Sequence, residues 1–458
     1  MWQRLGFHVC CVALTALWAP VATGAQQTEP PPPSCGTQQP GIVSLPAPAV
    51  VAGSATGLFD ILHAATGPEA VQEGDEQEPR PWGITWDQGL RFVAPHGAFT
   101  MRTAFNVQND SAAFVGDGEL ESKFGSLDGD VKWRRALVFA DGTFARHFRY
   151  KFQYDFANSD PPDLKDSWVE FDLPLVPITI RGGRFRTPLT LEGYTSTMHT
   201  TFMERGLVAT FVPSRNTGFL FSGEIGPQRH KMHWGLAWVR PEDPGQEGSP
   251  DASGITGRFT YKFNPREDVA AHAGFDYARL DLRGAEDVLR FSSRPESNLA
   301  PRLVDTGDFR VDATNTYVLE GAMVGGSLSV QSEFALVDAR GAEFVEEPVF
   351  WAGYVFVSYF ITGETRPYIA GREGFGRIRP LRDFRREGSG LGAFEVAARF
   401  STIDLSSGDI DGGELRDFTA AFNWYPNRNA RVMTNFIRAD RSDFGTMYIF
   451  QVRLQWHY

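Results

Sequence analysis

The last eleven residues of the chain alternate between bulky apolar and polar side chains. The apolar set is Tyr448, Phe450, Val452, Leu454, Trp456 and Tyr458. The polar set is Gln451, Arg453, Gln455 and His457. A period of two residues predicts a β-strand rather than a helix. Such a strand suits a soluble β-sandwich, or the closing strand of a barrel whose apolar face meets lipid and whose polar face meets water.

The same alternation recurs from about residue 99 onward. Its clearest example places Phe148, Tyr150, Phe152, Tyr154 and Phe156 on one face, against Arg149, Lys151, Gln153 and Asp155 on the other. A sandwich core interleaves large and small side chains, so five successive aromatic residues favour a lipid-facing surface. Further runs span 99–107, 169–173, 255–263, 269–277, 328–336, 394–400 and 418–424.

Turn residues separate many of these runs, as at Asp141-Gly142, Pro161-Pro162 and Asp411-Gly412-Gly413. The segment 82–458 has 377 residues. At about 20 to 25 residues per strand and connection, it predicts a transmembrane antiparallel β-barrel of about 16 strands, wide enough for an aqueous channel. An even strand number puts both ends of this domain on the periplasmic side.

The first 81 residues have a different character. Residues 1–25 read as a secretory signal peptide, with Arg4, an apolar core and small residues before Ala25. Residues 26–81 are rich in proline and acidic at their end, which predicts a periplasmic tether without a core of its own. Removal of the signal peptide leaves Cys35 as the only cysteine, so no intrachain disulfide is expected.

Composition narrows the function classes. The mean hydropathy is -0.26 and 22% of residues are charged, which excludes a helical membrane protein and a disordered one. No catalytic constellation or phosphate-binding glycine loop stands out, so we expect neither an enzyme nor a bound cofactor. His230 and His233 are three residues apart, which on a strand makes them face opposite ways, so we expect no metal site there. An acidic chain without a basic helix offers nothing to nucleic acid.

Several motifs resemble the phosphate-selective porin O and P family. They are Arg181–Glu192 with its Gly-Arg-Phe-Arg-Thr-Pro core, Tyr194–Met198, Phe202-Met-Glu-Arg205, Pro213–Gly218, Ser293–Glu296, Thr362–Arg366, Gly392–Glu395 and Asn423–Asn427. The resemblance runs from about residue 97 to 458. It implies an outer-membrane homotrimer of 16-stranded subunits, each with a loop, here Thr187 to Glu204, that folds into the lumen to form a constriction.

Candidate pore residues follow from the resemblance and from the predicted strand faces. The resemblance places Ser196 and Thr197 on the constriction loop, with Arg184 and Arg186 leading into it. The basic candidates on the faces opposite the aromatic residues are Arg102, Arg149, Lys151, Arg181, Arg258 and Lys262. For any one of these, pairing with a neighbouring acid is the simpler expectation than a role in transport.

Net charge does not support anion selectivity by itself. The whole chain carries -12, and subtracting the seven acids and two bases of residues 1–81 leaves 49 acids and 42 bases in 82–458. Selectivity depends on the lumen rather than on this sum. The sequence therefore predicts passive diffusion of small hydrophilic solutes, with a preference for phosphate-like anions. The alternatives are a nonselective or sugar porin of the same fold, a non-conducting barrel that serves as adhesin, enzyme or anchor, and a soluble sandwich.

Overall fold

The computed structural model describes residues 82–458, except 87–88, 126, 146, 158–160, 214, 228, 242–251, 267, 283–287, 342–345, 370–373 and 389. The predicted signal peptide and tether lie outside these residues and stay predictions. All described residues belong to one compact unit, Glu76–Tyr458. Among them, no helix is long and apolar enough to cross a membrane.

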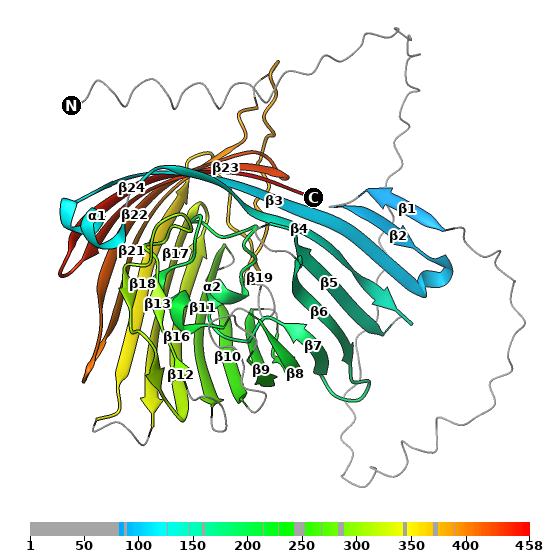
Figure 1. Cartoon of the computed structure of the whole chain (residues 1–458). Helices are drawn as coiled ribbons and strands as arrows, with labels where there is room; N and C mark the ends of the chain where they lie inside the picture. The colour runs from blue at the N-terminus through cyan, green and yellow to red at the C-terminus, as the bar shows by residue number, and fades with distance from the viewer. Residues whose placement is uncertain are drawn as a thin grey trace, which may run out of the picture. The chain divides into compact units, whose positions relative to one another are not determined.

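The chain forms one large antiparallel sheet that closes on itself (Figure 1). The sheet has 18 strands, and 16 remain when the short β1 (Gly83–Trp86) and β2 (Leu90–Val93) are set aside. The 16 barrel strands are β3 (Phe99–Gly116), β4 (Asp130–Phe144), β5 (Phe148–Asp155), β6 (Asp163–Asp172), β7 (Ile178–Phe185), β8 (Asn216–Ile225), β9 (His230–Arg240), β10 (Ser253–Arg266), β11 (Val269–Asp281), β16 (Ala313–Gly325), β17 (Leu328–Arg340), β18 (Val349–Phe360), β21 (Ala393–Ser407), β22 (Ile410–Asn427), β23 (Ala430–Arg441) and β24 (Gly445–His457). The predicted antiparallel barrel of about 16 strands is confirmed.

Shorter elements connect these strands. The helices are η1 (Pro95–Gly97), α1 (Gly118–Phe124), α2 (Leu191–Tyr194) and η2 (Leu207–Phe211). The two-residue strands are β12 (Val288–Leu289), β13 (Ser292–Ser293), β14 (Val304–Asp305), β15 (Phe309–Arg310), β19 (Tyr368–Ile369) and β20 (Gly374–Phe375).

The last strand closes the barrel by pairing with the first. β24 pairs with β3 from Met447 opposite Gly116 to His457 opposite Asn106. Beyond the end of β24, the same edge of β3 is continued by β2, which pairs with Thr100 to Thr103. We call the rim that holds the start of β3 and the end of β24 the terminal rim, and the opposite one the far rim.

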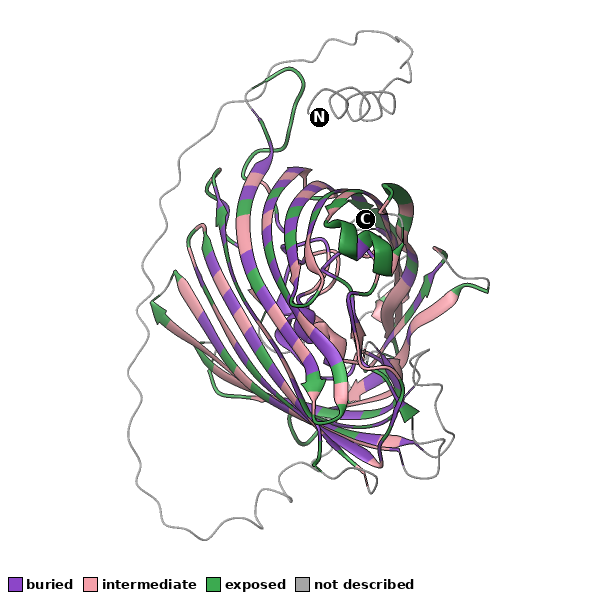
Figure 2. Cartoon of the chain, turned by 60° about the vertical axis from the view of Figure 1, so that its left-hand side comes forward, coloured by how far each residue is buried: buried purple, intermediate pink, exposed green. Residues whose placement is uncertain are grey.

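The two faces of β24 lie as the alternation predicts. Tyr448, Phe450, Leu454 and Trp456 are 42 to 54% exposed on the outer face, whereas Gln451, Arg453, Gln455 and His457 are at most 4% exposed on the inner face. Figure 2 shows the same alternation of buried and exposed bands on the neighbouring strands. An apolar outer face and a polar inner face are the arrangement of a membrane barrel and the reverse of a soluble sandwich.

The aromatic face of β5 also points outward, with Phe152 and Tyr154 46% and 42% exposed. Tyr150 is the exception, at 9%, because it lies over Gly142 of β4 and its hydroxyl donates to the Thr100 carbonyl oxygen at 3.2 Å. A Cβ on Gly142 would stand 1.9 Å from that oxygen. The glycine is therefore required inside the strand, and the predicted turn at Asp141-Gly142 is wrong: the chain turns after Phe144.

Connection lengths follow the predicted alternation with three exceptions. Most connections at the terminal rim are short, as at 145–147 and 326–327, and most at the far rim are longer, as at 186–215 and 282–312. The far-rim connections 408–409 and 442–444 are short, whereas 361–392 at the terminal rim is long. Asp411-Gly412-Gly413, expected to turn, lies inside β22 after the turn at 408–409. The long connections 186–215, 282–312 and 361–392 carry α2, β13 and β19, which lie within the barrel in Figure 1.

The interior is filled unevenly. Phe202 and Phe211 of the first inward segment pack with Phe291 of the second and with Phe350 and Phe356 of β18, at ring centroid distances of 5.1 to 5.7 Å. All five side chains are at most 7% exposed. This apolar core occupies the side of the lumen next to β17, β18 and β21. Open space lies along the wall formed by β3 to β7, and another cavity, of about 620 Å³, lies beside β11 and β16.

Candidate pore and constriction

The constriction loop, residues 187–204, is held on one side of the lumen by carboxylates. The backbone N–H of Thr190 donates to Oδ2 of Asp276 on β11 at 2.7 Å, and that of Glu192 donates to Oε1 of Glu333 on β17 at 2.9 Å. The Thr190 hydroxyl caps α2 by accepting from Gly193 N–H at 2.9 Å. These two hydrogen bonds and the cap fix the start of the loop.

Other wall residues hold the opposite side of the loop. Gln108 of β3 donates to the Thr197 carbonyl oxygen at 3.3 Å, and Gln455 of β24 donates to that of Met198 at 3.1 Å. Arg431 of β23 donates to the Thr200 carbonyl oxygen at 2.6 Å. The loop therefore crosses the lumen from β11 and β17 to β3, β23 and β24.

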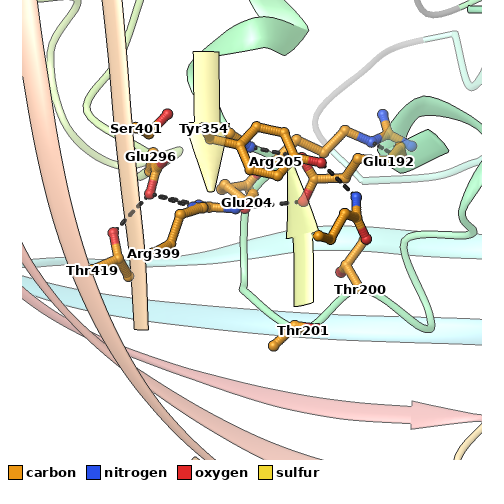
Figure 3. A network of polar contacts seen from close by, with 12 residues as sticks. Glu192, Thr200, Thr201, Glu204, Arg205, Glu296, Tyr354, Arg399, Ser401 and Thr419 are labelled. Carbon is orange, nitrogen blue, oxygen red and sulfur yellow. Dashed lines mark hydrogen bonds and ion pairs between the residues drawn. The ribbon is translucent and has the colours of Figure 1, made fainter. Parts of the chain in front are cut away.

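Arg399 of β21 joins two inward segments, as Figure 3 shows. Its guanidinium donates to Oε2 of Glu296 at 3.0 Å, to Oε1 of Glu192 at 3.4 Å and to the Glu204 carbonyl oxygen at 3.0 Å. The Thr419 hydroxyl adds a second donor to Glu296 at 2.7 Å. Because the Arg399 and Glu296 side chains are fully buried, each depends on the other to satisfy its charge.

A cavity of about 690 Å³ lies between the constriction loop and the wall of β3 to β7, toward the terminal rim. We call it the terminal cavity. Seven of the ten predicted residues line it: Arg102, Arg149, Lys151, Arg181, Arg186, Ser196 and Thr197. Arg91 and Arg377 bring the cations to seven, against the three acids Asp141, Asp166 and Glu170.

Each acid of the terminal cavity is bonded to a basic side chain. Asp141 accepts from Arg102 at 2.8 Å, and Asp166 lies 2.8 Å from Lys151 Nζ. Glu170 accepts from Arg149 at 2.7 Å and from Arg181 at 2.7 Å. The expected pairing with acids is therefore present, yet cations outnumber acids and leave an excess of positive charge.

Arg186 and Arg205 hold the bend of the constriction loop. Arg186 Nη1 donates to the carbonyl oxygens of Gly193 and Thr195 at 2.8 and 2.9 Å, and Arg205 Nη2 reaches the same oxygens at 3.1 and 3.3 Å. Burial lowers the pKa of Arg186 well below its ordinary value, and the positive charges of Arg215 and Arg205 add to that effect. Since arginine stays protonated in proteins, this bend holds several positive charges close together.

His199, also in the constriction loop, lies near the positive charges of Arg377 and Arg431. Burial, followed by the charges of Arg377 and Arg431, lowers the pKa of His199 to about 3. The imidazole therefore stays neutral at physiological pH. Its neighbour His457 lies edge-on at 5.9 Å between ring centroids.

A second cavity, of about 280 Å³, lies on the other side of the constriction loop toward the far rim. We call it the far cavity. Its basic residues are Arg134, Arg135, Arg205, Arg294 and Arg302, its acids are Glu204 and Glu296, and its hydroxyl groups come from Thr197, Thr200, Thr210, Ser292, Ser293 and Ser297. Thr197 of the constriction loop lines both cavities and so lies between them.

Both acids of the far cavity are engaged by arginine. Glu204 accepts from Arg134 at 2.7 Å and from Arg453 at 2.6 Å, while Glu296 accepts from Arg399. Burial opposes the Glu204 charge, yet Arg134 and Arg453 lower the pKa of this carboxyl well below its usual range. Arginine side chains thus neutralise both acids. The other arginines that line the far cavity are Arg135, Arg205, Arg294 and Arg302.

Three predicted residues lie elsewhere. In the pairing of β7 with β8, Arg184 stands opposite Thr217. Its side chain belongs to the outward face of the sheet, which also carries Ile180 and Phe219. Arg258 is buried against Glu320 at 2.7 Å, with its guanidinium 4.6 Å from the Tyr194 ring, so it supports the loop. Lys262 Nζ lies 6.0 Å from the Tyr368 ring, on the side of the barrel opposite the terminal cavity's wall.

Sequence reasoning missed five arginines, and it named Arg205 only as part of the Phe202-Met-Glu-Arg205 motif. The missed residues are Arg91, Arg135, Arg294, Arg302 and Arg377. Arg294 belongs to the Ser293–Glu296 motif and donates to the Ala300 carbonyl oxygen, while Arg302 donates to the Ser292 carbonyl oxygen at 3.0 Å. The family motif Ser293–Glu296, which contains Arg294, was the one feature of the sequence that could have pointed to this region. His230 and His233, considered as a metal pair, face opposite ways: His230 bonds the Tyr261 hydroxyl at 2.8 Å, and His233 is buried inside.

A family model, phosphate-selective porin O and P, matches residues 103–458. The chain belongs to the phosphate-selective porin O and P family. This porin is therefore an outer-membrane protein, and its fold is that of a channel. In such barrels the turns on the periplasmic side are short and the extracellular loops are longer. We therefore assign the terminal rim, where most connections are short, to the periplasmic side and the far rim to the extracellular side.

Known proteins similar to this porin share its fold at low sequence identity. An uncharacterized protein of Caulobacter vibrioides is 24% identical over 369 residues, which cover 78% of this chain and 71% of that protein. A loop L8 deletion mutant of OmpT, an outer membrane protein of Vibrio cholerae, is 9% identical with a TM-score of 0.50, covering 79% of this chain and 100% of its own. The trimer form of OmpT gives 8% identity, a TM-score of 0.50 and the same coverage.

Proposed function

We propose that this porin conducts small anions, phosphate among them, along the β3 to β7 side of its lumen. The observation that carries the proposal is the excess of cations in two cavities that share Thr197: seven against three, and five against two. Guanidinium and hydroxyl groups replace part of an anion's hydration shell in steps, and no single group binds tightly enough to stop transit.

The sugar alternative is less well supported because arginine side chains already lie over three aromatic rings of the terminal cavity, those of Phe139, Trp168 and Tyr194. Trp168 lines the terminal cavity, but the Arg181 guanidinium lies over its ring at 4.0 Å. A sugar would need such a ring free for stacking. The non-conducting alternative is disfavoured by the two cavities that share Thr197.

Phosphate added to a chloride solution tests the preference. We expect inorganic phosphate to reduce the single-channel chloride current in planar bilayers in a saturable way, because a divalent anion stays longer among the arginines. Sulfate and a neutral sugar of similar size serve as controls. A chloride current that phosphate leaves unchanged would contradict phosphate binding in the pore.

We also propose that the porin is a homotrimer, as the trimer form of OmpT is. The mass of the detergent-extracted protein, measured by native mass spectrometry, should equal three chains. A single-chain mass in mild detergent would sink the proposal.

A further inference from the structure

The segment 381–391 at the periplasmic rim folds back on itself beside the end of β22. Within it, Arg385 N–H donates to the Gly390 carbonyl oxygen at 3.1 Å, and Gly392 N–H donates to that of Arg382 at 3.2 Å. Phe384 N–H donates to the Pro426 carbonyl oxygen at 2.7 Å. These bonds attach the segment to the last residues of β22.

The segment continues the outer, lipid-facing surface of the barrel. The Phe384 ring meets Trp424 edge-on at 5.4 Å, and the Trp424 indole N–H donates to the Leu391 carbonyl oxygen at 2.8 Å. Trp424 follows Phe418 and Phe422 on the outward face of β22, where these two are 48% and 45% exposed. A tryptophan at the end of an apolar outer face lies at the level of the lipid headgroups.

Apolar and basic side chains are exposed together at this place. Leu381, Phe384 and Leu391 are 70%, 47% and 62% exposed. Residues 379–387 contain four arginines against the two acids Asp383 and Glu387. We define the rim patch as Leu381, Arg382, Phe384, Arg385, Arg386 and Leu391, all of which are exposed. Basic residues beside apolar ones are the pattern of segments that bind an anionic membrane surface.

We propose that the rim patch binds anionic phospholipid of the periplasmic leaflet. The arginines bind the headgroup phosphate with two parallel N–H donors each, and the three apolar side chains contact the upper part of the acyl chains. Free phosphate provides only the first of these contacts. Continuity with the lipid-facing surface through Trp424 favours a lipid over a soluble partner.

Native mass spectrometry of the full-length porin tests the proposal with phosphatidylglycerol and phosphatidylcholine as probes. Wild-type protein should retain phosphatidylglycerol in preference to phosphatidylcholine. The triple variant Arg382→Gln, Arg385→Gln, Arg386→Gln should lose that retention by about tenfold or more. The matched control changes Arg340, Arg416 and Arg438, exposed arginines at the extracellular rim, to Gln and should retain lipid as wild type does.

Two further readouts separate lipid from other ligands. Phe384→Ser, which leaves the arginines in place, should also lower phosphatidylglycerol retention, and this single change serves if the triple variant fails to fold. Equal retention by these variants and wild type would overturn the proposal. It would also fail if inorganic phosphate alone displaced the lipid, or if the patch captured peptidoglycan fragments while lipid retention stayed unchanged in the variants.

Discussion

Arg186→Glu is expected to lower the permeability of the channel to chloride by about tenfold and to raise that to potassium by a similar factor. Arg186 lines the terminal cavity, where cations exceed acids by seven to three. At roughly 6 Å from the path, and with the dielectric constant of bulk water, exchanging a positive for a negative charge changes an anion's energy by about 1.4 kcal/mol. That energy corresponds to about tenfold in chloride permeability. Because the potassium energy changes by the same amount in the opposite direction, the chloride-to-potassium ratio, measured as the reversal potential in a potassium chloride gradient, changes by up to about 100-fold.

Arg184→Glu is the matched control, two residues earlier and with the same change of charge. Arg184 lies on the outward face of the barrel, so the reversal potential of the Arg184→Glu channel should stay close to that of wild type. Arg186→Gln should give an intermediate shift, about tenfold in the chloride-to-potassium ratio, because it removes one charge instead of reversing it. If Arg184→Glu shifted the potential as much as Arg186→Glu, the path we assign would be wrong.

Arg399→Ala is expected to increase single-channel conductance and reduce ion selectivity. The substitution removes the donors that bind Glu296, Glu192 and the Glu204 carbonyl oxygen, so both inward segments lose their common anchor on β21. Removing one partner of a buried pair costs about 3 to 5 kcal/mol, since the remaining carboxylate stays buried without its counter-charge. Current recordings and the melting temperature in detergent measure the two effects.

A double variant shows whether the effect comes from the buried pair. Arg399→Ala combined with Glu296→Gln should recover part of the lost stability, because the stranded negative charge is gone. Arg416→Ala on β22, an exposed arginine paired with Glu414, should change neither conductance nor stability. Wild-type conductance in Arg399→Ala would show that the segments do not depend on this residue.

The strands and their faces were predictable because alternation is a local property. Tyr448 to Tyr458 needs no distant contact to reveal which side chains lie outside. Turn positions were less predictable. Asp141-Gly142 has the composition of a turn, but the glycine is there because the Thr100 backbone of the neighbouring strand β3 leaves no room for a Cβ. Only the register of β3 with β4 reveals this.

The candidate site was predictable where it lies on strands. Arg149, Lys151 and Arg181 follow from face assignment and line the terminal cavity. Arg184 and Arg186 are both near the end of β7, and only the pairing of β7 with β8 shows that Arg184 faces outward. Arg294 and Arg302 come from a connection about 90 residues after the constriction loop, so their place beside it depends on the folding of 282–312 into the lumen.

The most direct test of the central claim is to measure which ion, chloride or potassium, carries the current through the wild-type channel. Purified protein in a planar bilayer, with a tenfold gradient of potassium chloride, should give a zero-current potential of the sign set by chloride. The cation excess of both cavities predicts that sign, although residues 82–458 have a net negative charge. A potential of the sign set by potassium, or one near zero, would contradict the account.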